Sequence, residues 1–266
     1  MKHRLWVICL LLLLFFLAQV IGLIVSEHYS HGEALPLGIE RPELNPETSY
    51  VSLFFIMLLA TAIALALLYF RLFLIWRFWF LVSIFVTLVI SLNAFFSYYV
   101  SLAFAIVFSL WRILKPNPII HNLSEIFIYG ALAAIFVPIL TLFSVFILLI
   151  LISLYDYIAV RKTRHMVKLA KSQSEAKVFA GLLIPYDKNV AMLGGGDIGF
   201  PLLFSAVVMN SYGLGLLDFR SYIVPFCAGL LLLALFIKGE KKKYYPAMPY
   251  ITLGCVLGVL LLGFFI

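Results

Sequence analysis

Two aspartates stand inside strongly apolar stretches of this sequence, where an ionisable side chain is costly and is therefore a candidate for chemistry. Asp156 lies near the end of one apolar run, and Asp197 closes the segment Gly194-Gly195-Gly196-Asp197 at the start of the next. The neighbouring apolar runs offer no obvious basic partner, which a structural carboxylate would normally have. Close carboxylates cannot both ionise, so such a pair would share one proton and activate a water molecule.

Each aspartate also has a plain structural explanation. Asp156 could be a helix-end charge that reaches out to water or pairs with Arg161, five residues further along. Asp197 could be the N-cap of a helix, because three glycines followed by Asp suit a loop from which a helix starts. Two acids at matching depth favour the catalytic interpretation over both.

The composition sets the environment in which this chemistry would occur. Of the 266 residues, 65% are hydrophobic and 12% are charged, whereas soluble domains carry about 25% charged residues. The chain therefore needs a lipid bilayer around it. All three cysteines lie in apolar runs, which favours small buried hydrophobes over a disulfide or metal framework. The net charge of +7 is spread over short clusters rather than a continuous stripe, so we expect no nucleic-acid partner. We also expect no metal and no cofactor, since the sequence shows no metal-ligand framework and chemistry by two carboxyl groups requires neither.

The apolar runs predict an all-α, polytopic transmembrane bundle of about nine spans, since about 20 apolar residues cross a bilayer. The breaks near Asn93 and Pro138 are weak, so eight or ten spans stay open. The nine runs cover about residues 5–25, 50–70, 72–92, 94–114, 119–137, 138–160, 190–210, 222–237 and 249–266.

The basic residues predict the orientation of the chain. With nine spans, 17 of the 19 Lys and Arg residues fall on one side, and only Arg41 and Arg220 fall on the other. Because cytoplasmic loops are enriched in basic residues, we expect a cytoplasmic N-terminus and an external C-terminus. The organisation is one membrane-embedded domain over 1–266, with six spans in 1–160, a short cytoplasmic loop at 161–189 and three spans in 190–266.

This topology places both aspartates near the cytoplasmic face. Asp156 lies about 7 Å inside the boundary at Arg161, at 1.5 Å per residue, and Asp197 enters from the same side. Irregular backbone is tolerated in a membrane only where it is buried in protein or lines a water-filled cavity, so the glycines before Asp197 fit a hydrolytic site. They would also let a substrate backbone come close. The stretch 188–193 is prone to an extended conformation and could offer a strand edge to an unwound substrate, or it could be the first turn of the helix.

A third segment, Pro246-Ala247-Met248-Pro249, directly precedes the ninth span on the same side. Proline in the first turn is an ordinary helix start, and that explanation stays open. Its position beside the two aspartates is what makes it a candidate for supporting the site.

Together these segments resemble the motifs of a known family. Tyr155-Asp156, the GGGD segment ending at Asp197, and Pro246 to Met248 are similar to the YD, GxGD and PAL motifs of the presenilin and signal peptide peptidase family. The resemblance implies a protease that cuts within membrane segments, with Asp156 and Asp197 catalytic and the other motif residues supporting the site or binding substrate. A cytoplasmic N-terminus is similar to presenilin, whereas signal peptide peptidases are inverted.

Two departures from the family pattern are visible. Met248 stands where the family usually has Leu, which is a soft apolar replacement of similar size. The loop 161–189 is much shorter than that of eukaryotic presenilins, so the chain is most similar to a microbial homologue that acts uncleaved. Its expected partners are transmembrane protein substrates and the bilayer of the cell membrane, and a homo-oligomer stays open.

Three other functions fit parts of the sequence. Paired intramembrane acids also suit a proton- or cation-coupled transporter or channel, although no inverted repeat is visible. A prepilin peptidase shares a GxGD-type motif but has fewer spans and no PAL segment. A non-catalytic scaffold would leave the two aspartates unexplained. A further motif, Asn122-Leu123-Ser124, matches a glycosylation acceptor, but the charge bias places it on the cytoplasmic side, where we expect no glycan.

Overall fold

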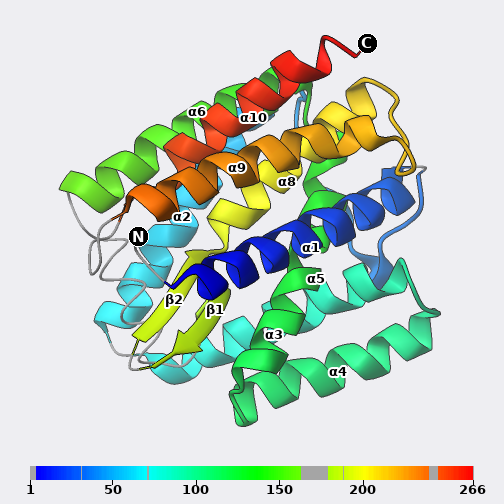
Figure 1. The fold of residues 1–266 in the computed structure, drawn as a ribbon. Coiled ribbons are helices and arrows are strands. Elements are labelled where there is room, and N and C mark those ends of the chain that lie inside the picture. Colours follow the sequence, from blue (N-terminus) through cyan, green and yellow to red (C-terminus); the bar gives the residue numbers. More distant parts are fainter. Residues whose placement is uncertain are drawn as a thin grey trace.

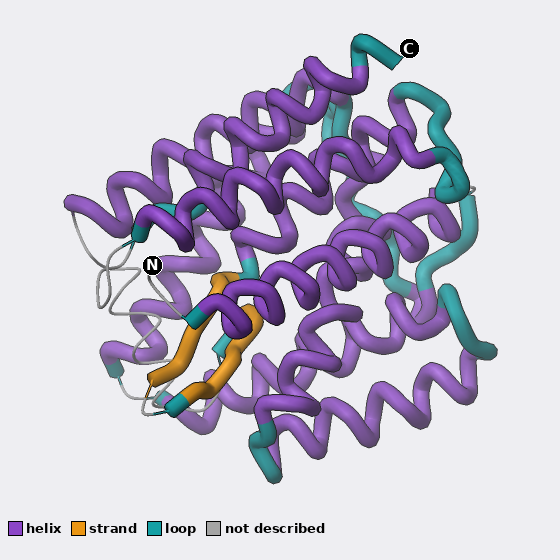
Figure 2. The backbone as a smooth tube through the Cα atoms, viewed as in Figure 1, coloured by secondary structure: helices purple, strands orange, loops and turns teal. Residues whose placement is uncertain are grey.

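The computed structural model describes residues 4–30, 32–70, 72–162, 179–187, 189–239 and 245–265. Within these residues, nine α-helices form a bundle that carries a two-stranded hairpin at one end (Figures 1 and 2). The N-terminus lies near the hairpin and the C-terminus at the opposite end. The helices are α1 (Leu5–Ser30), α2 (Ser49–Tyr69), α3 (Phe73–Asn93), α4 (Tyr98–Leu114), α5 (Pro118–Phe136), α6 (Leu142–Tyr157), α8 (Gly196–Ser211), α9 (Ile223–Lys238) and α10 (Met248–Leu262). The strands are β1 (Gly181–Tyr186) and β2 (Asn189–Gly194).

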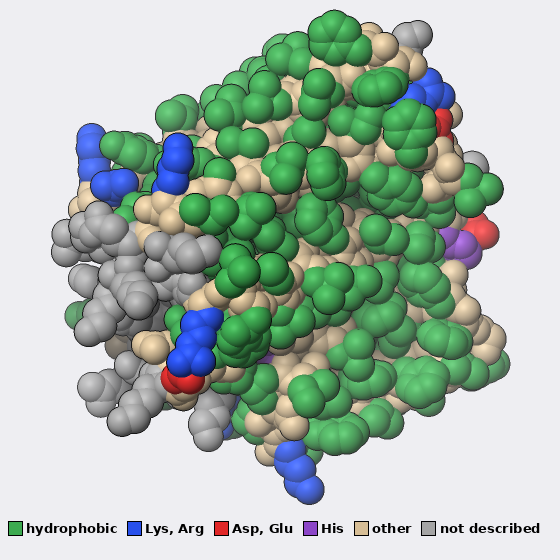
Figure 3. Space-filling view, viewed as in Figure 1, with side chains coloured by type: hydrophobic (Ala, Val, Ile, Leu, Met, Phe, Trp, Pro, Cys, Tyr) green, Lys and Arg blue, Asp and Glu red, His purple; other side chains and the backbone are tan. Residues whose placement is uncertain are grey.

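Each of the nine predicted runs coincides with one helix, as expected for apolar segments in lipid, where backbone groups must bond within the segment. Among the described helices, α1, α2, α3, α5, α6 and α9 are long and apolar enough to cross a membrane, whereas α4 and α10 are shorter apolar helices. The face drawn in Figure 3 is a broad hydrophobic band with charged side chains gathered towards its ends. This distribution is that of a protein embedded in a bilayer.

The two weak breaks are present in the structure. Helix α3 ends at Asn93, and Pro138 lies in a 3-10 turn between α5 and α6. Both following helices start about four residues later than predicted. At the start of α6, the Thr141 hydroxyl accepts the Ser144 N–H at 3.1 Å, which fixes the helix start after the proline turn.

The hairpin corrects the predicted start of the seventh helix at residue 190 and adds two short strands to the all-α bundle. Residues 189–194 form β2, which pairs antiparallel with β1, and α8 begins only at Gly196. Strand β1 lies inside the predicted loop 161–189. The extended conformation expected for 188–193 is confirmed from Asn189 to Leu193, and Lys188 lies outside the described residues. Pairing satisfies backbone groups that an isolated strand would leave unbonded.

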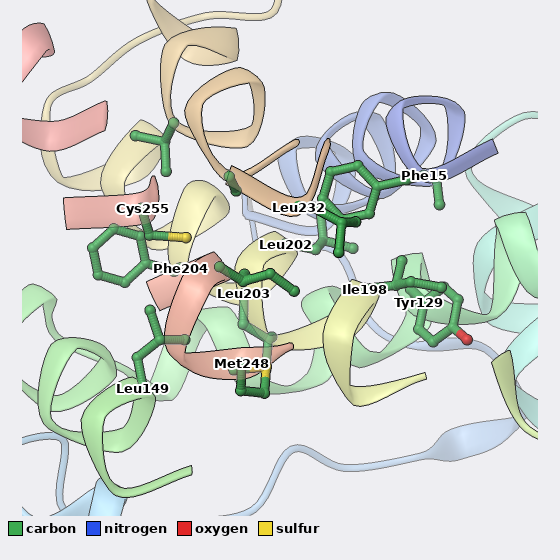
Figure 4. Packing of buried hydrophobic residues seen from close by; sticks show 14 of the residues in the cluster. Phe15, Tyr129, Leu149, Ile198, Leu202, Leu203, Phe204, Leu232, Met248 and Cys255 are labelled. Carbon is green, nitrogen blue, oxygen red and sulfur yellow. The ribbon is translucent and has the colours of Figure 1, made fainter. Parts of the chain in front are cut away.

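Helix α1 lies at the centre of the bundle and packs against α5, α8 and α9. Its Phe15 and the α8 residues Ile198 and Leu202 are almost completely buried, and Figure 4 draws them in one core with Met248. By contrast, α2 lies at the periphery with large apolar side chains such as Phe55 exposed. The same apolar composition therefore serves packing in α1 and lipid contact in α2.

Helices α9 and α10 pack unusually closely because of two glycines on α10. A Cβ atom on Gly254 would lie 2.6 Å from the Cα of Ala228, and one on Gly258 would lie 2.7 Å from the Cα of Val224. Small residues four apart let helix backbones approach one another in a membrane. This contact fixes α10, whose first residues belong to the candidate site.

Candidate active site

Asp156 lies in the last turn of α6 and is bonded to the start of α10. The Met248 N–H donates a hydrogen bond to Oδ2 of Asp156 at 3.1 Å. Met248 is the first residue of α10, so its N–H has no acceptor within the helix, and the carboxylate supplies one. The segment Pro246 to Met248 is buried against this contact. The structure therefore brings the third motif directly to Asp156.

A second polar contact ties the same two helices together one turn further from the site. The hydroxyls of Ser153 on α6 and Thr252 on α10 lie 2.5 Å apart. No ion pair within the described residues joins Asp156 to Arg161, whose guanidinium lies over the Tyr245 ring. The helix-end pairing considered for Asp156 is thus not seen, and Tyr155 is half-buried beside it in α6.

Asp197 lies in the first turn of α8, where Gly195 occupies the cap position. The N-cap explanation for Asp197 is therefore wrong, because it is the second helical residue. A Cβ atom on Gly194 would lie 3.3 Å from Oδ2 of Asp197, and one on Gly195 would lie 3.0 Å from the Tyr129 hydroxyl. The glycines thus leave room around the carboxylate and against α5, whereas Gly196 has only ordinary contact with its surroundings.

Helices α6 and α8 pack against each other, and α10 packs against both. Asp156 is near the end of α6, Asp197 is near the start of α8, and Met248 begins α10. All three motifs therefore gather at the end of the bundle that carries the hairpin (Figure 1).

Gln19 belongs to the region around Asp197, although no motif in the sequence pointed to it. Gln19 is completely buried in α1, and its Nε2 donates to the carbonyl oxygen of Ile198 at 2.9 Å. Pro201 lies inside α8 and has no N–H for the carbonyl of Asp197, so the first turns of α8 are not bonded as in a regular helix. The available signal was a polar residue in the middle of the first apolar run.

Two other residues have different environments from those predicted. Arg112, counted with the topological charges, is 3% exposed and forms an ion pair with Glu125, an acid within an apolar run that was not among the predicted site residues. Asn122, considered as a glycan acceptor, bonds through its side chain to both backbone groups of Leu183. Arg112 on α4 and Asn122 on α5 thus both bond to the segment that contains β1.

Among the described residues, no group of three or more His, Cys, Asp or Glu side chains is placed to hold a metal ion. The three cysteines are free thiols, with Cys227 and Cys255 buried in the α9 and α10 region.

Comparison with known proteins agrees with this geometry. Residues 12–266 match the family model described as signal-peptide peptidase, presenilin aspartyl protease. Two solved structures, both titled as a presenilin family intramembrane aspartate protease, in space groups C222 and P2, share the fold. The first has a TM-score of 0.69 at 19% identity over 97% of this chain and 99% of that chain. The second has a TM-score of 0.68 at 18% identity over 96% and 97%.

Among curated proteins, none matches the sequence significantly. The family match nevertheless spans nearly the whole chain and includes all three motifs, and it does not favour a transporter or channel. The chain therefore belongs to the signal-peptide peptidase and presenilin family of intramembrane aspartyl proteases.

Proposed function

We propose that the protein hydrolyses peptide bonds within or near the transmembrane segments of other membrane proteins, with Asp156 and Asp197 as its catalytic pair. The observation that carries this proposal is the hydrogen bond from Met248 to Asp156, because it joins two of the three motifs across 92 residues of sequence. The packing of α8 against both of these helices supports a meeting with Asp197. Tyr155, Gly194 to Gly196 and Pro246 to Pro249 support the site or contact substrate.

The proposed reaction needs only the two carboxyl groups and water. One carboxylate takes a proton from the water, whose oxygen attacks the carbonyl carbon, while the protonated partner donates to the carbonyl oxygen. As the tetrahedral diol collapses and its C–N bond breaks, the amine leaves with the proton of one carboxyl group, and one hydroxyl returns its proton to the other carboxylate. Since one proton stays on the pair throughout, the reaction requires no cofactor.

The hairpin supports a specific way of presenting the substrate. Leu183 directs its N–H and C=O to Asn122, away from β2, so its partner in the register, Met192, also directs its backbone groups outwards. By the alternation of strands, Val190 and Gly194 do the same. Within the residues that the structure describes, no further strand pairs with this edge of β2, and β2 runs directly into the first turn of α8 that carries Asp197. We propose that an unwound substrate adds to this edge as a further strand.

We also propose that the protein is a multi-pass component of the cell membrane, built as one domain, with its N-terminus and both aspartates towards the cytoplasm. The bias of the basic residues supports this orientation. Reporter fusions at the two termini test it, and the expected result is a cytoplasmic signal from the N-terminus and an external signal from the C-terminus. A signal from the same compartment at both termini contradicts the nine-span topology.

The decisive test is cleavage by the purified protein in lipid vesicles. A single-span substrate is incubated with the wild type, and the products are identified by mass spectrometry. We expect new termini inside the substrate span, and none when Asp156→Asn or Asp197→Asn replaces the wild type. Intact substrate after prolonged incubation with several unrelated spans would contradict the proposed activity.

A further inference from the structure

The outer edge of β1, which faces away from β2, is covered by side chains of α4 and α5. Three alternate carbonyls along this edge each accept a hydrogen bond from one of them. The bonds run from Arg112 Nη2 to Phe179 O (3.0 Å), from His121 Nε2 to Gly181 O (2.7 Å) and from Asn122 Nδ2 to Leu183 O (2.8 Å). We name Arg112, His121 and Asn122 the edge clamp.

Asn122 imitates the pairing of a neighbouring strand. Besides donating to the Leu183 carbonyl, its Oδ1 accepts the Leu183 N–H at 2.9 Å. A β-strand partner would offer the same donor and acceptor to that residue. Pro185, the next outward residue of β1, has no N–H to offer. The outer edge of β1 is therefore occupied, whereas the corresponding outward groups of β2 lie on the edge that we propose for substrate.

One member of the edge clamp, Arg112, carries a buried charge, and burying a charge is energetically costly unless it is paired. Arg112 and Glu125 are 3% and 2% exposed, and Arg112 also donates to the Ser124 hydroxyl at 2.7 Å. A buried ion pair often contributes less to stability than apolar residues of the same size would. The pair nevertheless delivers a guanidinium N–H to the Phe179 carbonyl, just before β1.

From β1 the chain of contacts reaches the catalytic segment. The Ala180 carbonyl accepts the Gly195 N–H at 3.2 Å, on the inner side of β1. The Tyr129 hydroxyl donates to Glu125 and lies beside Gly195, where a Cβ atom would be 3.0 Å away. Gly195 is two residues from Asp197. The segment of β1 and the Tyr129 side chain therefore both contact Gly195, in the turn that positions Asp197.

We infer that the edge clamp consists of positioning residues that select the substrate register: it closes the β1 edge and holds the β2 edge in a fixed relation to Asp197. This inference rests on the proposed proteolytic function and on strand addition to β2. It assigns to Asn122 and Arg112 an influence on where the substrate is cut. A structural role alone would change only the amount of folded protein.

The first test measures backbone hydrogen exchange in the wild type and needs no substrate. Leu183 and Met192 are cross-strand partners, and both direct their N–H groups away from the hairpin. We expect the Leu183 amide, bonded to Asn122, to exchange at least about tenfold more slowly than the Met192 amide. Equal rates at the two amides would overturn the inference whether or not the protein cleaves any substrate.

The second test compares Asn122→Leu with Asn93→Leu in the cleavage assay. Asn93 is also a half-buried asparagine, but it bonds to the Tyr29 hydroxyl at 3.3 Å, at the opposite end of α1. Asn122→Leu removes both hydrogen bonds to Leu183, and the loss of each corresponds to about a fivefold change. We expect Asn122→Leu to raise KM at least about fivefold and to spread the cleavage sites over neighbouring peptide bonds, whereas Asn93→Leu keeps the wild-type sites.

Asn122→Asp provides a second variant in case Asn122→Leu does not fold. It keeps the acceptor for the Leu183 N–H but sets a carboxylate oxygen against the Leu183 carbonyl in place of the donor, so we expect a spread of sites here as well. Wild-type cleavage sites and KM in folded preparations of both variants would overturn the inference. Absence of cleavage by the wild type would instead count against the proposed function, and the exchange test would still decide the edge clamp.

Discussion

The two halves of the candidate site are held in different ways. The Asp197 half is framed by side-chain bonds to backbone, from Gln19 to α8 and from the edge clamp to β1. The Asp156 half is held by helix packing, by a backbone hydrogen bond from Met248 and by the contact between the Ser153 and Thr252 hydroxyls. Polar bonds in a low-dielectric interior are directional, whereas packing of small residues fixes only distance. We therefore expect the Asp197 half to set the substrate register and the Asp156 half to depend on the placement of α10.

The largest expected effect treats both halves alike. Asp156→Asn and Asp197→Asn should each lower cleavage by at least about 100-fold, because each removes one member of the acid-base pair. The double variant should be no worse than either single one, since the two groups act as a unit. Thermal unfolding on the same preparations should show no loss of stability. Substantial cleavage by either variant would contradict a shared-proton mechanism.

The next variant breaks the Asp156 half through its packing. Gly254→Leu places a side chain where even a Cβ atom would lie 2.6 Å from the Ala228 backbone, so α10 must move. We expect a loss of about 3 kcal/mol of stability and a lower kcat. The Leu183 amide should keep its slow exchange, because β1 does not depend on α10.

Gly263→Ala is the matched control for that variant. A Cβ atom at Gly263 has only ordinary contacts, the nearest at 3.4 Å, so stability and activity should stay close to wild type. If Gly254→Leu left both stability and kcat unchanged, the dependence of the Asp156 half on α10 packing would be wrong.

A third variant breaks the Asp197 half at the strand. Gly181 has a φ of +136°, and a Cβ atom there would lie 2.2 Å from the Leu193 carbonyl oxygen. Gly181→Ala should therefore separate the two strands, cost about 2 kcal/mol and speed exchange at Leu183. The control is Gly196→Ala, where the nearest atom to a Cβ is 3.4 Å away on the flexible Phe200 side chain. Unchanged exchange at Leu183 in Gly181→Ala would show that the hairpin tolerates the strain.

The smallest expected effect concerns Met248, the residue at which the third motif departs from the family pattern. Met248 contributes its N–H to Asp156, and its side chain is 3% exposed in the core. Met248→Leu keeps the backbone donor and nearly the same volume, so stability should change by less than about 1.5 kcal/mol and activity should stay near wild type. Pro246→Leu in parallel should lower activity more than stability. A large loss of activity in Met248→Leu alone would mean that the thioether itself has a role.

Much of this molecule follows from local pattern. Apolar runs of about 20 residues predict helices because lipid leaves the backbone no other bonding partner. Costly acids in apolar segments marked Asp156 and Asp197, and proline ahead of the last run marked the start of α10. These signals lie within single segments, so the sequence contains them without reference to the rest of the fold.

The contacts that complete the site join residues far apart in the chain, and no local pattern encodes them. Met248 meets Asp156 across 92 positions, and Asn122 meets Leu183 across 61. Residues 190–194 of β2 were predicted to begin a helix because their strand partner, β1, lies in a segment that the sequence predicted to be a loop. Arg112 looked like a topological charge because only the tertiary structure brings Glu125 and the Phe179 carbonyl to it. Local sequence thus specifies the helices and the acids, whereas the side-chain bonds to distant backbone groups form only in the folded chain, because hydrogen bonds depend on where the whole chain places each atom.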